Sequence, residues 1–421
     1  MHSPGTKNRT ESGLNISGAG PRFGSTKLAA AAIRGALTLA VLSALLLIAT
    51  RPAQAQTETV LYNFAGNPDG AYPFSHLTSD GAGNFYGTTQ YGGTGQAGGG
   101  LGYGTVFELS PNGNGGWNET VLYSFTGKAD GGYPAYSPVI FDRVGNLYGT
   151  TSQGGGDGYG AVFELSPVGG SWAESVLYSF DYYTDDPATG VIMDVAGNLY
   201  GTNAAGVFEL SPSGGGWTMQ MIYNVATFTA GLTMDAAGNI YGTTLLTVFE
   251  LSPNGNGGWN PTVIHTFTGA PKDGAWAEGT PVLDKAGNLY GTTYYGGAKN
   301  LGTVYKLSPG KKGKWTEKIL HSFKGGTKDG SGPAAAGIVF DTAGNIYGTT
   351  ALAGKSGDGT VFELVAPVGK GSYKEKVLWS FNKTDGYQPA DSLILDSAGN
   401  LYGTTYEGGS NGVGVVFEVT P

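Results

Sequence analysis

A hexapeptide with the pattern Asn-Leu-Tyr-Gly-Thr-Thr recurs seven times, with small variations, along this 421-residue chain. The copies begin at Asn84, Asn146, Asn198, Asn239, Asn288, Asn345 and Asn400. Around each copy, short runs rich in Val, Thr, Tyr and Phe alternate with clusters of Gly, which is typical of strands joined by tight turns. Repeats of about 40 to 50 residues with several short strands each are typical of β-propeller blades. The sequence therefore predicts an all-β fold, a seven-bladed β-propeller.

Four antiparallel strands are expected in each repeat. In the second repeat they cover residues 136–142, 146–151, 160–167 and 172–180. An Asp-x-x-Gly-Asn sequence joins the first two strands of every copy, and its Asp residues are Asp80, Asp142, Asp194, Asp235, Asp284, Asp341 and Asp396. Asp suits the first position of a type I turn, because its carboxylate can accept backbone N–H groups. We interpret these residues as turn residues and not as calcium ligands, because the alternating ligand spacing of a calcium loop is missing.

The order of the strands predicts how the ring closes. A fourth-strand sequence, residues 59–64, comes before the first complete repeat, and the chain ends on a third strand that contains Val419. The N-terminal strand is therefore expected to complete the last blade, which leaves no open sheet edge between the two ends. The expected propeller domain covers residues 56–421.

Residues 1–55 are predicted to be a secretory signal peptide with a lead-in. Lys27 and Arg34 precede an apolar run at 36–49, and Ala53-Gln54-Ala55 fits a cleavage site of small residues. The apolar run is short for a membrane-spanning helix of about 20 residues, although an uncleaved membrane anchor is the alternative. We expect an exported monomer, secreted or held in the periplasm or cell envelope, with no membrane span after cleavage.

Composition and charge exclude several kinds of site and partner. The chain has no Cys, which excludes disulfides, zinc–thiolate sites, Fe–S clusters and thiol nucleophiles. Residues 56–421 carry 17 Lys and Arg against 31 Asp and Glu. This net negative charge repels phosphate backbones, so no nucleic-acid partner is expected.

The repeat unit resembles a known family. Its consensus, Gly-Asn-Leu-Tyr-Gly-Thr-Thr followed by Gly-Gly and Gly-Thr-Val-Phe-Glu-Leu-Ser-Pro, is similar to the GloVer tandem repeat of exported bacterial proteins over residues 57–421. The third and fourth repeats depart from it, since the segments that begin at Tyr200 and Leu245 lose the glycine linker. Family members often carry a C-terminal anchor, whereas this chain stops on its last strand at Pro421, so anchoring is not expected. The resemblance implies a repeat fold and export, but no particular activity.

One face of the ring is expected to carry the fourth-to-first and second-to-third loops of the blades. Five fourth-to-first loops contain Asp-Gly, and an aromatic follows in four of them; these residues are Asp69, Asp130, Asp273, Asp329 and Asp385, with Tyr72, Tyr133, Trp276 and Tyr387. Aromatic rings beside carboxylates suit sugar recognition, because a ring covers the apolar face of a sugar and carboxylates accept its hydroxyl groups. The alternative is that Asp-Gly only forms the turn. Blades three and four lack Asp-Gly and have short loops, which predicts a notch in this face.

Three further residues break the pattern of the first strand, which is expected to face the central channel. His76 stands where other repeats have Pro, Gly, Thr or Ser, Glu278 is charged where the others are uncharged, and Asp391 replaces a small residue. The first and last blades are neighbours in a closed ring, so His76 and Asp391 are expected to lie close together. Such a pair can act as a base with its orienting carboxylate or as a weak cation site. The alternative is a polar pair without a role in catalysis or binding.

Two other sets of residues are interpreted as structural. Six aromatic residues open fourth strands and are expected to pack within the blades: Trp117, Trp172, Trp217, Trp259, Trp315 and Tyr373. His265 and His321 occupy the Tyr position of the fourth strand. They are expected to be outer-strand side chains and not ligands or bases.

The leading functional hypothesis is a non-catalytic exported propeller that binds a glycan or a protein partner at its loop face, without a cofactor or a metal ion. One alternative is a polysaccharide hydrolase or lyase that uses Glu278, Asp391 and Glu407 together with His76. The other alternative is a purely structural protein of the cell envelope. The sequence contains no recognisable nucleophile with its base, phosphate-binding loop or metal cluster.

Overall fold

The computed structural model describes residues 56–95, 100–134, 136–182, 187, 189–225, 230–333, 337–389 and 391–421. Residues 55–421 form one compact unit, and the predicted signal peptide lies outside the described residues. In the described part of the chain, no helix has the length and hydropathy needed to cross a membrane. The single helical turn there is η1 (Lys311–Gly313).

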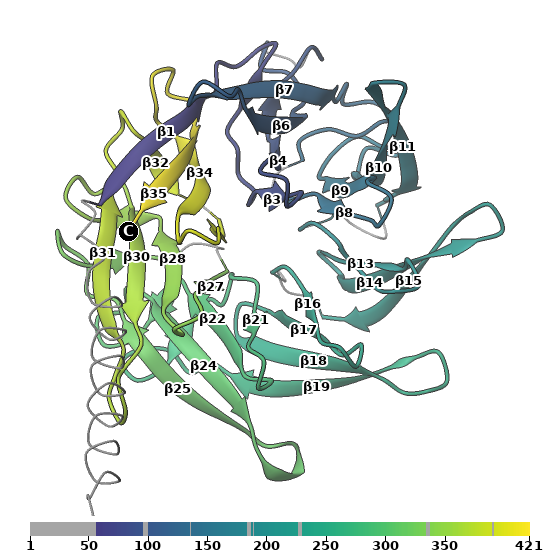
Figure 1. Cartoon of the computed structure of the whole chain (residues 1–421). Coiled ribbons are helices and arrows are strands. Elements are labelled where there is room, and N and C mark those ends of the chain that lie inside the picture. Colours follow the sequence, from purple (N-terminus) through teal and green to yellow (C-terminus); the bar gives the residue numbers. More distant parts are fainter. Residues whose placement is uncertain are drawn as a thin grey trace, which may run out of the picture. The chain divides into compact units, whose positions relative to one another are not determined.

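Seven antiparallel sheets, each built on four strands, form the blades of a β-propeller, which confirms the predicted fold class (Figure 1). Blades 1 and 2 contain β3 (Thr78–Ser79), β4 (Phe85–Thr89), β6 (Thr105–Pro111), β7 (Trp117–Ser124), β8 (Ile140–Phe141), β9 (Leu147–Thr151), β10 (Ala161–Val168) and β11 (Ser171–Ser179). Blades 3 and 4 contain β12 (Ile192–Met193), β13 (Leu199–Asn203), β14 (Gly206–Ser213), β15 (Gly216–Asn224), β16 (Thr233–Met234), β17 (Ile240–Thr243), β18 (Thr247–Pro253) and β19 (Trp259–Thr266). Blades 5 and 6 contain β21 (Val282–Leu283), β22 (Leu289–Thr293), β24 (Thr303–Pro309), β25 (Trp315–Ser322), β27 (Val339–Phe340), β28 (Ile346–Thr350), β30 (Thr360–Val365) and β31 (Lys374–Ser380). Blade 7 contains β33 (Ile394–Leu395), β34 (Leu401–Glu407), β35 (Val415–Thr420) and β1 (Thr57–Asn63).

The first strand of each blade is shorter than the sequence predicts. In blade 2, β8 covers only Ile140–Phe141, where residues 136–142 were expected. Pro138 has no N–H to donate to a sheet ladder, and Tyr136 lies in the left-handed region with a φ of 55°. The residues before β8 therefore approach the channel as irregular backbone.

The ring closes as predicted, because the N-terminal strand completes the last blade. β1 pairs with β35 in antiparallel register, with Thr57 opposite Thr420 and Asn63 opposite Val415. Figure 1 shows β1 lying beside β35, with β34 on the inner side of this blade. Phe64, which follows β1, is fully buried among residues of blades 7 and 1. The closure thus joins sheet pairing to a shared core.

The turn before each hexapeptide is held by the side chain of its Asp. In blade 2, Asp142 Oδ1 accepts the backbone N–H groups of Val144, Gly145 and Asn146 at 2.8 to 2.9 Å. Asp142 Oδ2 accepts the Asn146 side-chain amide at 2.9 Å and the Tyr148 hydroxyl at 3.2 Å. The Asn and the Tyr of the hexapeptide therefore satisfy the turn carboxylate, as expected for a turn residue.

The rest of the hexapeptide packs and links the blades. A Cβ on Gly149 would lie 2.6 Å from Cζ of Phe163, so only Gly leaves room for that buried ring. The hydroxyl of Thr150 donates to the carbonyl of Thr189 in the next blade at 2.9 Å. At the closure, the hydroxyl of Thr404 donates to the carbonyl of Ser75 at 3.2 Å. These hydrogen bonds therefore link neighbouring blades.

The aromatic residues that open the fourth strands pack as predicted. Trp172 packs against a buried cluster that contains Phe163 and Leu165. The ring of Trp259 in blade 4 lies edge to face with Tyr200 of blade 3, with centroids 5.7 Å apart. These residues therefore extend the hydrophobic contact between adjacent blades.

Candidate functional site

Short strand pairs bring two loops of a blade together on one face of the ring. β2 (Gly70–Ala71) pairs with β5 (Tyr91–Gly92), β20 (Gly274–Ala275) with β23 (Tyr295–Gly296), and β26 (Gly330–Ser331) with β29 (Leu352–Ala353). In blade 7, β32 (Tyr387–Pro389) pairs with β34. The fourth-to-first and second-to-third loops therefore meet, as the sequence predicts. We call this surface the loop face.

The five Asp-Gly carboxylates bond to their own loops. Asp130 accepts the backbone N–H and the hydroxyl of Thr126 at 2.8 and 2.6 Å. Asp273 accepts the same two groups of Thr268 at 2.7 and 2.9 Å. The carboxylates of Asp69, Asp329 and Asp385 also accept backbone N–H groups of their own loops. These contacts are those of turn residues, and a role of the five carboxylates in ligand binding stays a prediction.

A Glu on the outer strand of the same blade faces each Asp-Gly carboxylate, which the sequence analysis missed. The pairs are Asp69–Glu119, Asp130–Glu174, Asp273–Glu317, Asp329–Glu375 and Asp385–Glu58. Burial, together with the Asp69 carboxylate, raises the pKa of Glu119 to about 8. The signal was present in the repeats, because blades 3 and 4 lack Asp-Gly and carry Met219 and Pro261 at the Glu position. We call these five pairs the carboxyl pairs.

The residue three positions after each Asp-Gly aspartate has a left-handed backbone. It is Tyr72, Tyr133 or Trp276 in blades 1, 2 and 5, with φ between 55° and 59°. In blade 7 the equivalent residue is Gln388, with a φ of 53°, and Tyr387 precedes it. The N–H of Tyr133 donates to the carbonyl of Tyr103 in the preceding blade at 2.7 Å. An aromatic residue in this region is uncommon, so the loop contacts must hold it there.

The aromatic residues of these loops differ in their exposure to solvent. Trp276 is 44% exposed. Tyr72 and Tyr133 are only partly exposed, because each packs against the ring of Tyr91 with centroids 5.6 and 5.3 Å apart. Tyr387 is also partly buried, and the amino group of Lys383 lies 5.6 Å from its ring centroid.

A pocket of about 920 Å³ is lined by residues of blades 1 to 5 and of blade 7. Its lining includes four residues singled out from the sequence, His76, Trp276, Glu278 and Asp391. Short loops border it at blades 3 and 4, where Ala204 and Leu245 contribute to the lining. The short loops at this border are those from which the sequence predicts a notch in the loop face. The other predicted ligand-binding residues and Glu407 are not part of this lining.

His76 and Asp391 lie close together, as expected from the closure of the ring. The backbone N–H of His76 donates to Asp391 Oδ2 at 2.8 Å, and His76 Nδ1 lies 3.5 Å from Asp391 Oδ1. Glu278 lines the same pocket from blade 5, and burial raises its pKa. A carboxyl group, a carboxylate and an imidazole therefore share one cavity.

Tyr136 is a pocket residue that the sequence analysis assigned to a strand. Its side chain is 47% exposed, and its ring lies edge to face with Phe74 at 4.2 Å. Partial burial and the carboxylate of Glu278 raise the pKa of Tyr136. Pro138, two residues further on, was the available sign that the strand starts later.

Solved structures with the same fold are similar to this chain at low sequence identity. Virginiamycin B lyase from Staphylococcus aureus matches with a TM-score of 0.53 and 11% identity, covering 87% of this chain and 99% of that chain. The extracellular domain of a hybrid two-component system from B. thetaiotaomicron matches with a TM-score of 0.53 and 14% identity, covering 87% of this chain and 41% of that chain. Both likenesses concern the fold alone.

The sequence comparisons give the family. No curated protein matches the chain at a significant level. The model of the Gloeobacter/Verrucomicrobia repeat matches residues 47–246, 203–370 and 311–421. With its seven hexapeptide repeats and its seven blades, the chain belongs to the Gloeobacter/Verrucomicrobia repeat family.

Proposed function

We propose that this protein is a non-catalytic binding module that holds a glycan chain in the pocket of its loop face. The observation that carries the proposal is the pair of exposed aromatic side chains, Tyr136 and Trp276, in the lining of a pocket of about 920 Å³. They belong to blades 2 and 5, on either side of the short loops of blades 3 and 4. A ligand that reached both rings would lie across these two blades.

The chemistry of the pocket suits a sugar. Exposed aromatic rings can stack on the C–H faces of pyranose rings. The carboxyl groups of Glu278 and Asp391 supply acceptors for hydroxyl groups, and His76 supplies a donor or an acceptor. Ile140, Ile192 and Leu232 contribute apolar surface to the lining of the pocket. Pockets that combine apolar walls with a few polar groups are typical of small-ligand sites.

A glycan array probed with the purified protein tests the proposal, followed by calorimetric titration of the best oligosaccharide. Trp276→Ala should weaken binding by about 1 to 3 kcal/mol, because one stacking ring is lost. The free energy of unfolding of the Trp276→Ala variant should change by less than about 1 kcal/mol. Leu101→Ala is a matched control, since Leu101 is 52% exposed and lies outside the pocket lining. The proposal fails if no glycan binds, or if Trp276→Ala binds as tightly as the unmodified protein.

A hydrolase or lyase that acts on polysaccharides is the second candidate. The contact between His76 and Asp391 favours it, because a carboxylate that orients an imidazole is a common arrangement for a general base. Incubation with a panel of polysaccharides, followed by analysis of reducing ends and unsaturated products, tests this candidate. Release of products by the unmodified protein and not by His76→Ala would favour an enzyme over a binding module.

We further propose that the propeller works outside the cytoplasm, secreted or in the cell envelope. The N-terminal sequence supports this location: Lys27 and Arg34 precede the apolar run at 36–49, and small residues follow at 53–55. Two structures of similar fold are extracellular domains of two-component systems, which agrees with it. Fractionation of cells that produce the full chain, with mass spectrometry of its N-terminus, tests both export and cleavage.

A further inference from the structure

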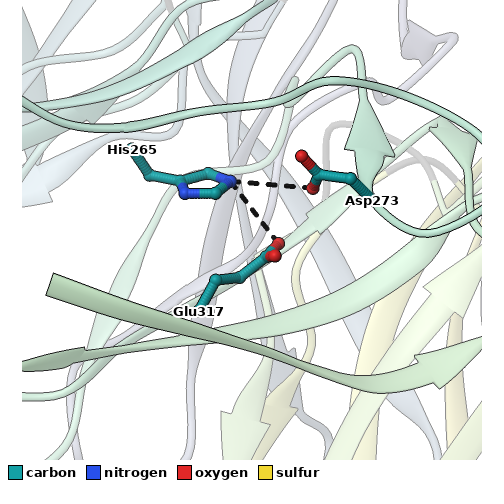
Figure 2. Close-up of side chains that lie close together, drawn as sticks. All are labelled: His265, Asp273 and Glu317. Atoms are coloured by element: carbon teal, nitrogen blue, oxygen red, sulfur yellow. Dashed lines mark ion pairs between the residues drawn. The ribbon is translucent and has the colours of Figure 1, made fainter.

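Three ionisable side chains converge where blade 4 meets blade 5. His265 comes from β19, Asp273 from the loop that enters blade 5, and Glu317 from β25. Figure 2 shows the ring of His265 pointing toward both carboxyl groups. His265 Nε2 lies 3.6 Å from Asp273 Oδ1 and 3.5 Å from Glu317 Oε1. One potential ligand atom from each residue lies within 4.8 Å of the other two.

These separations are long for hydrogen bonds but suit ligands around one small cation. Nitrogen and oxygen atoms that bind zinc at about 2.0 to 2.1 Å in a tetrahedron lie about 3.4 Å apart. Good N–H···O hydrogen bonds are about 2.7 to 3.2 Å long. His265 Nε2 is buried, and no hydrogen-bond partner within the described residues reaches it. Glu317 Oε1 is buried in the same way, but so is the Oε1 atom of the Glu in each of the other four carboxyl pairs, so only the histidine atom distinguishes this boundary. Buried polar atoms without a partner are rare in folded proteins.

The other blade boundaries supply an internal comparison. At the boundaries that carry Asp69 and Asp130, a tyrosine stands at the position of His265, and its hydroxyl donates to the Asp at 3.0 and 3.1 Å. At the next boundary, His321 Nε2 lies 3.2 Å from Asp329 Oδ1, within hydrogen-bond distance. Among the described residues, the set at the blade 4–5 boundary is the only one in which three His or carboxylate side chains gather this closely. The arrangement is therefore particular to this boundary.

We propose that His265, Asp273 and Glu317 bind one divalent transition-metal ion of the zinc type, with a fourth position left for water. One imidazole and two carboxylates are suitable ligands for such an ion. Asp273 Oδ2 accepts the N–H and hydroxyl of Thr268. Asp273 Oδ1 accepts the N–H of Gly274 at 2.6 Å and lies 3.6 Å from His265 Nε2, and its second lone pair remains for a metal ion. The hydroxyl and N–H of Thr268 thus orient the ligand, as supporting residues do in metal centres. This proposal revises the interpretation of His265 as an outer-strand side chain without a ligand role.

The bound ion would connect the outer strand of blade 4 to that of blade 5 through the loop between them. This loop continues through β20 to Trp276. The backbone N–H of Ala277, the next residue, donates to the carbonyl of Leu245 at 3.3 Å. The site therefore lies at the base of the segment that carries Trp276 into the pocket. Metal binding is expected to stabilise this segment.

Calorimetric titration of the chelator-treated full chain with zinc chloride alone tests the proposal, together with thermal melting with and without zinc. We expect one zinc ion per chain and a higher melting temperature when zinc is present. His265→Tyr introduces the residue found at two other boundaries, so it should fold, and it should weaken zinc binding at least 100-fold. His321→Tyr is the matched control and should bind zinc as the unmodified protein does.

Three outcomes would overturn the proposal. The first is an unmodified protein that neither binds zinc nor melts at a higher temperature with it. The second is zinc binding that His265→Tyr leaves unchanged, which would place the ion elsewhere. The third is an equal loss of zinc affinity in His265→Tyr and His321→Tyr. This would mean that both outer-strand histidines affect zinc binding only by stabilising the fold. If His265→Tyr fails to fold, Glu317→Gln gives the same test, since the amide is a poor metal ligand.

Discussion

Replacement of Glu119 by Gln should remove a part of the pH dependence of folding. Glu119 faces Asp69, and burial and this carboxylate raise the pKa of Glu119 from 4.5 to about 8. The folded protein therefore keeps the proton up to about pH 8, whereas the unfolded chain loses it near pH 4.5. Between these pH values folding takes up a proton, so stability is greatest below the lower value and falls as the pH rises.

The size of the effect follows from the pKa difference. Each pKa unit corresponds to about 1.4 kcal/mol, so the full shift gives an upper bound of roughly 5 kcal/mol above pH 8. Glu119 is only partly buried, and its side chain can turn toward water once it is ionised. We therefore expect Glu119→Gln to be more stable than the unmodified protein by about 2 kcal/mol at pH 9. At pH 5 the two proteins should agree within about 0.5 kcal/mol, because Gln imitates the protonated acid.

Urea unfolding followed by tryptophan fluorescence at half-unit pH steps from 5 to 9 measures this difference. Asp157→Asn is the matched control, because Asp157 is an exposed carboxylate in a loop, and its profile should follow that of the unmodified protein. The reasoning would be refuted by a Glu119→Gln profile parallel to that of the unmodified protein, or by a variant that is less stable at pH 9.

Three further predictions concern the fold. Deletion of residues 57–64 should expose the edge of β35 and cost several kcal/mol, seen as aggregation or a lower melting temperature; an unchanged melting temperature would contradict the closure. Trp172→Ala should lower stability by about 3 kcal/mol in urea unfolding without a selective loss of ligand binding, and ligand loss at unchanged stability would mean that Trp172 belongs to a binding surface. Gly149→Ala should destabilise the protein by about 1 to 3 kcal/mol, because the added Cβ would meet the ring of Phe163. Gly145→Ala is the comparison. A Cβ there would have free space, but the φ is 96°, so this variant should act only through backbone strain. A Gly149→Ala protein as stable as the original would show that the ring can move away.

The fold could be predicted almost completely, because the same turn and strand residues recur in each repeat. The turn Asp, the Asn that bonds to it and the strand residues are all short-range signals, and the order of the strands predicts the closure. The first strands were predicted too long. In blade 2 the strand was expected over residues 136–142 but covers only Ile140–Phe141. The alternation of apolar and polar residues does not show where a segment has no neighbouring strand to pair with.

The candidate site could be predicted only in part. His76 and Asp391 were placed together by ring closure alone, and the structure brings them into contact. Tyr136 was missed because its exposure depends on a left-handed backbone that no single residue type indicates. The carboxyl pairs were missed for another reason. Asp69 and Glu119 lie far apart in the sequence, and their relation becomes visible only when the Asp-Gly loops and the outer strands of all seven repeats are compared together.

The pairing of β1 with β35 has a consequence for the order in which the molecule forms during synthesis. Blades 1 to 6 each consist of consecutive strands, so every one of them can assemble as soon as its own segment has been made. Blade 7 cannot, because its outer strand is made first and its inner strands are made last. Until β35 is available, β1 lacks its strand partner, and the ring is incomplete. A chain cut short anywhere before β35 therefore cannot close the ring in this way.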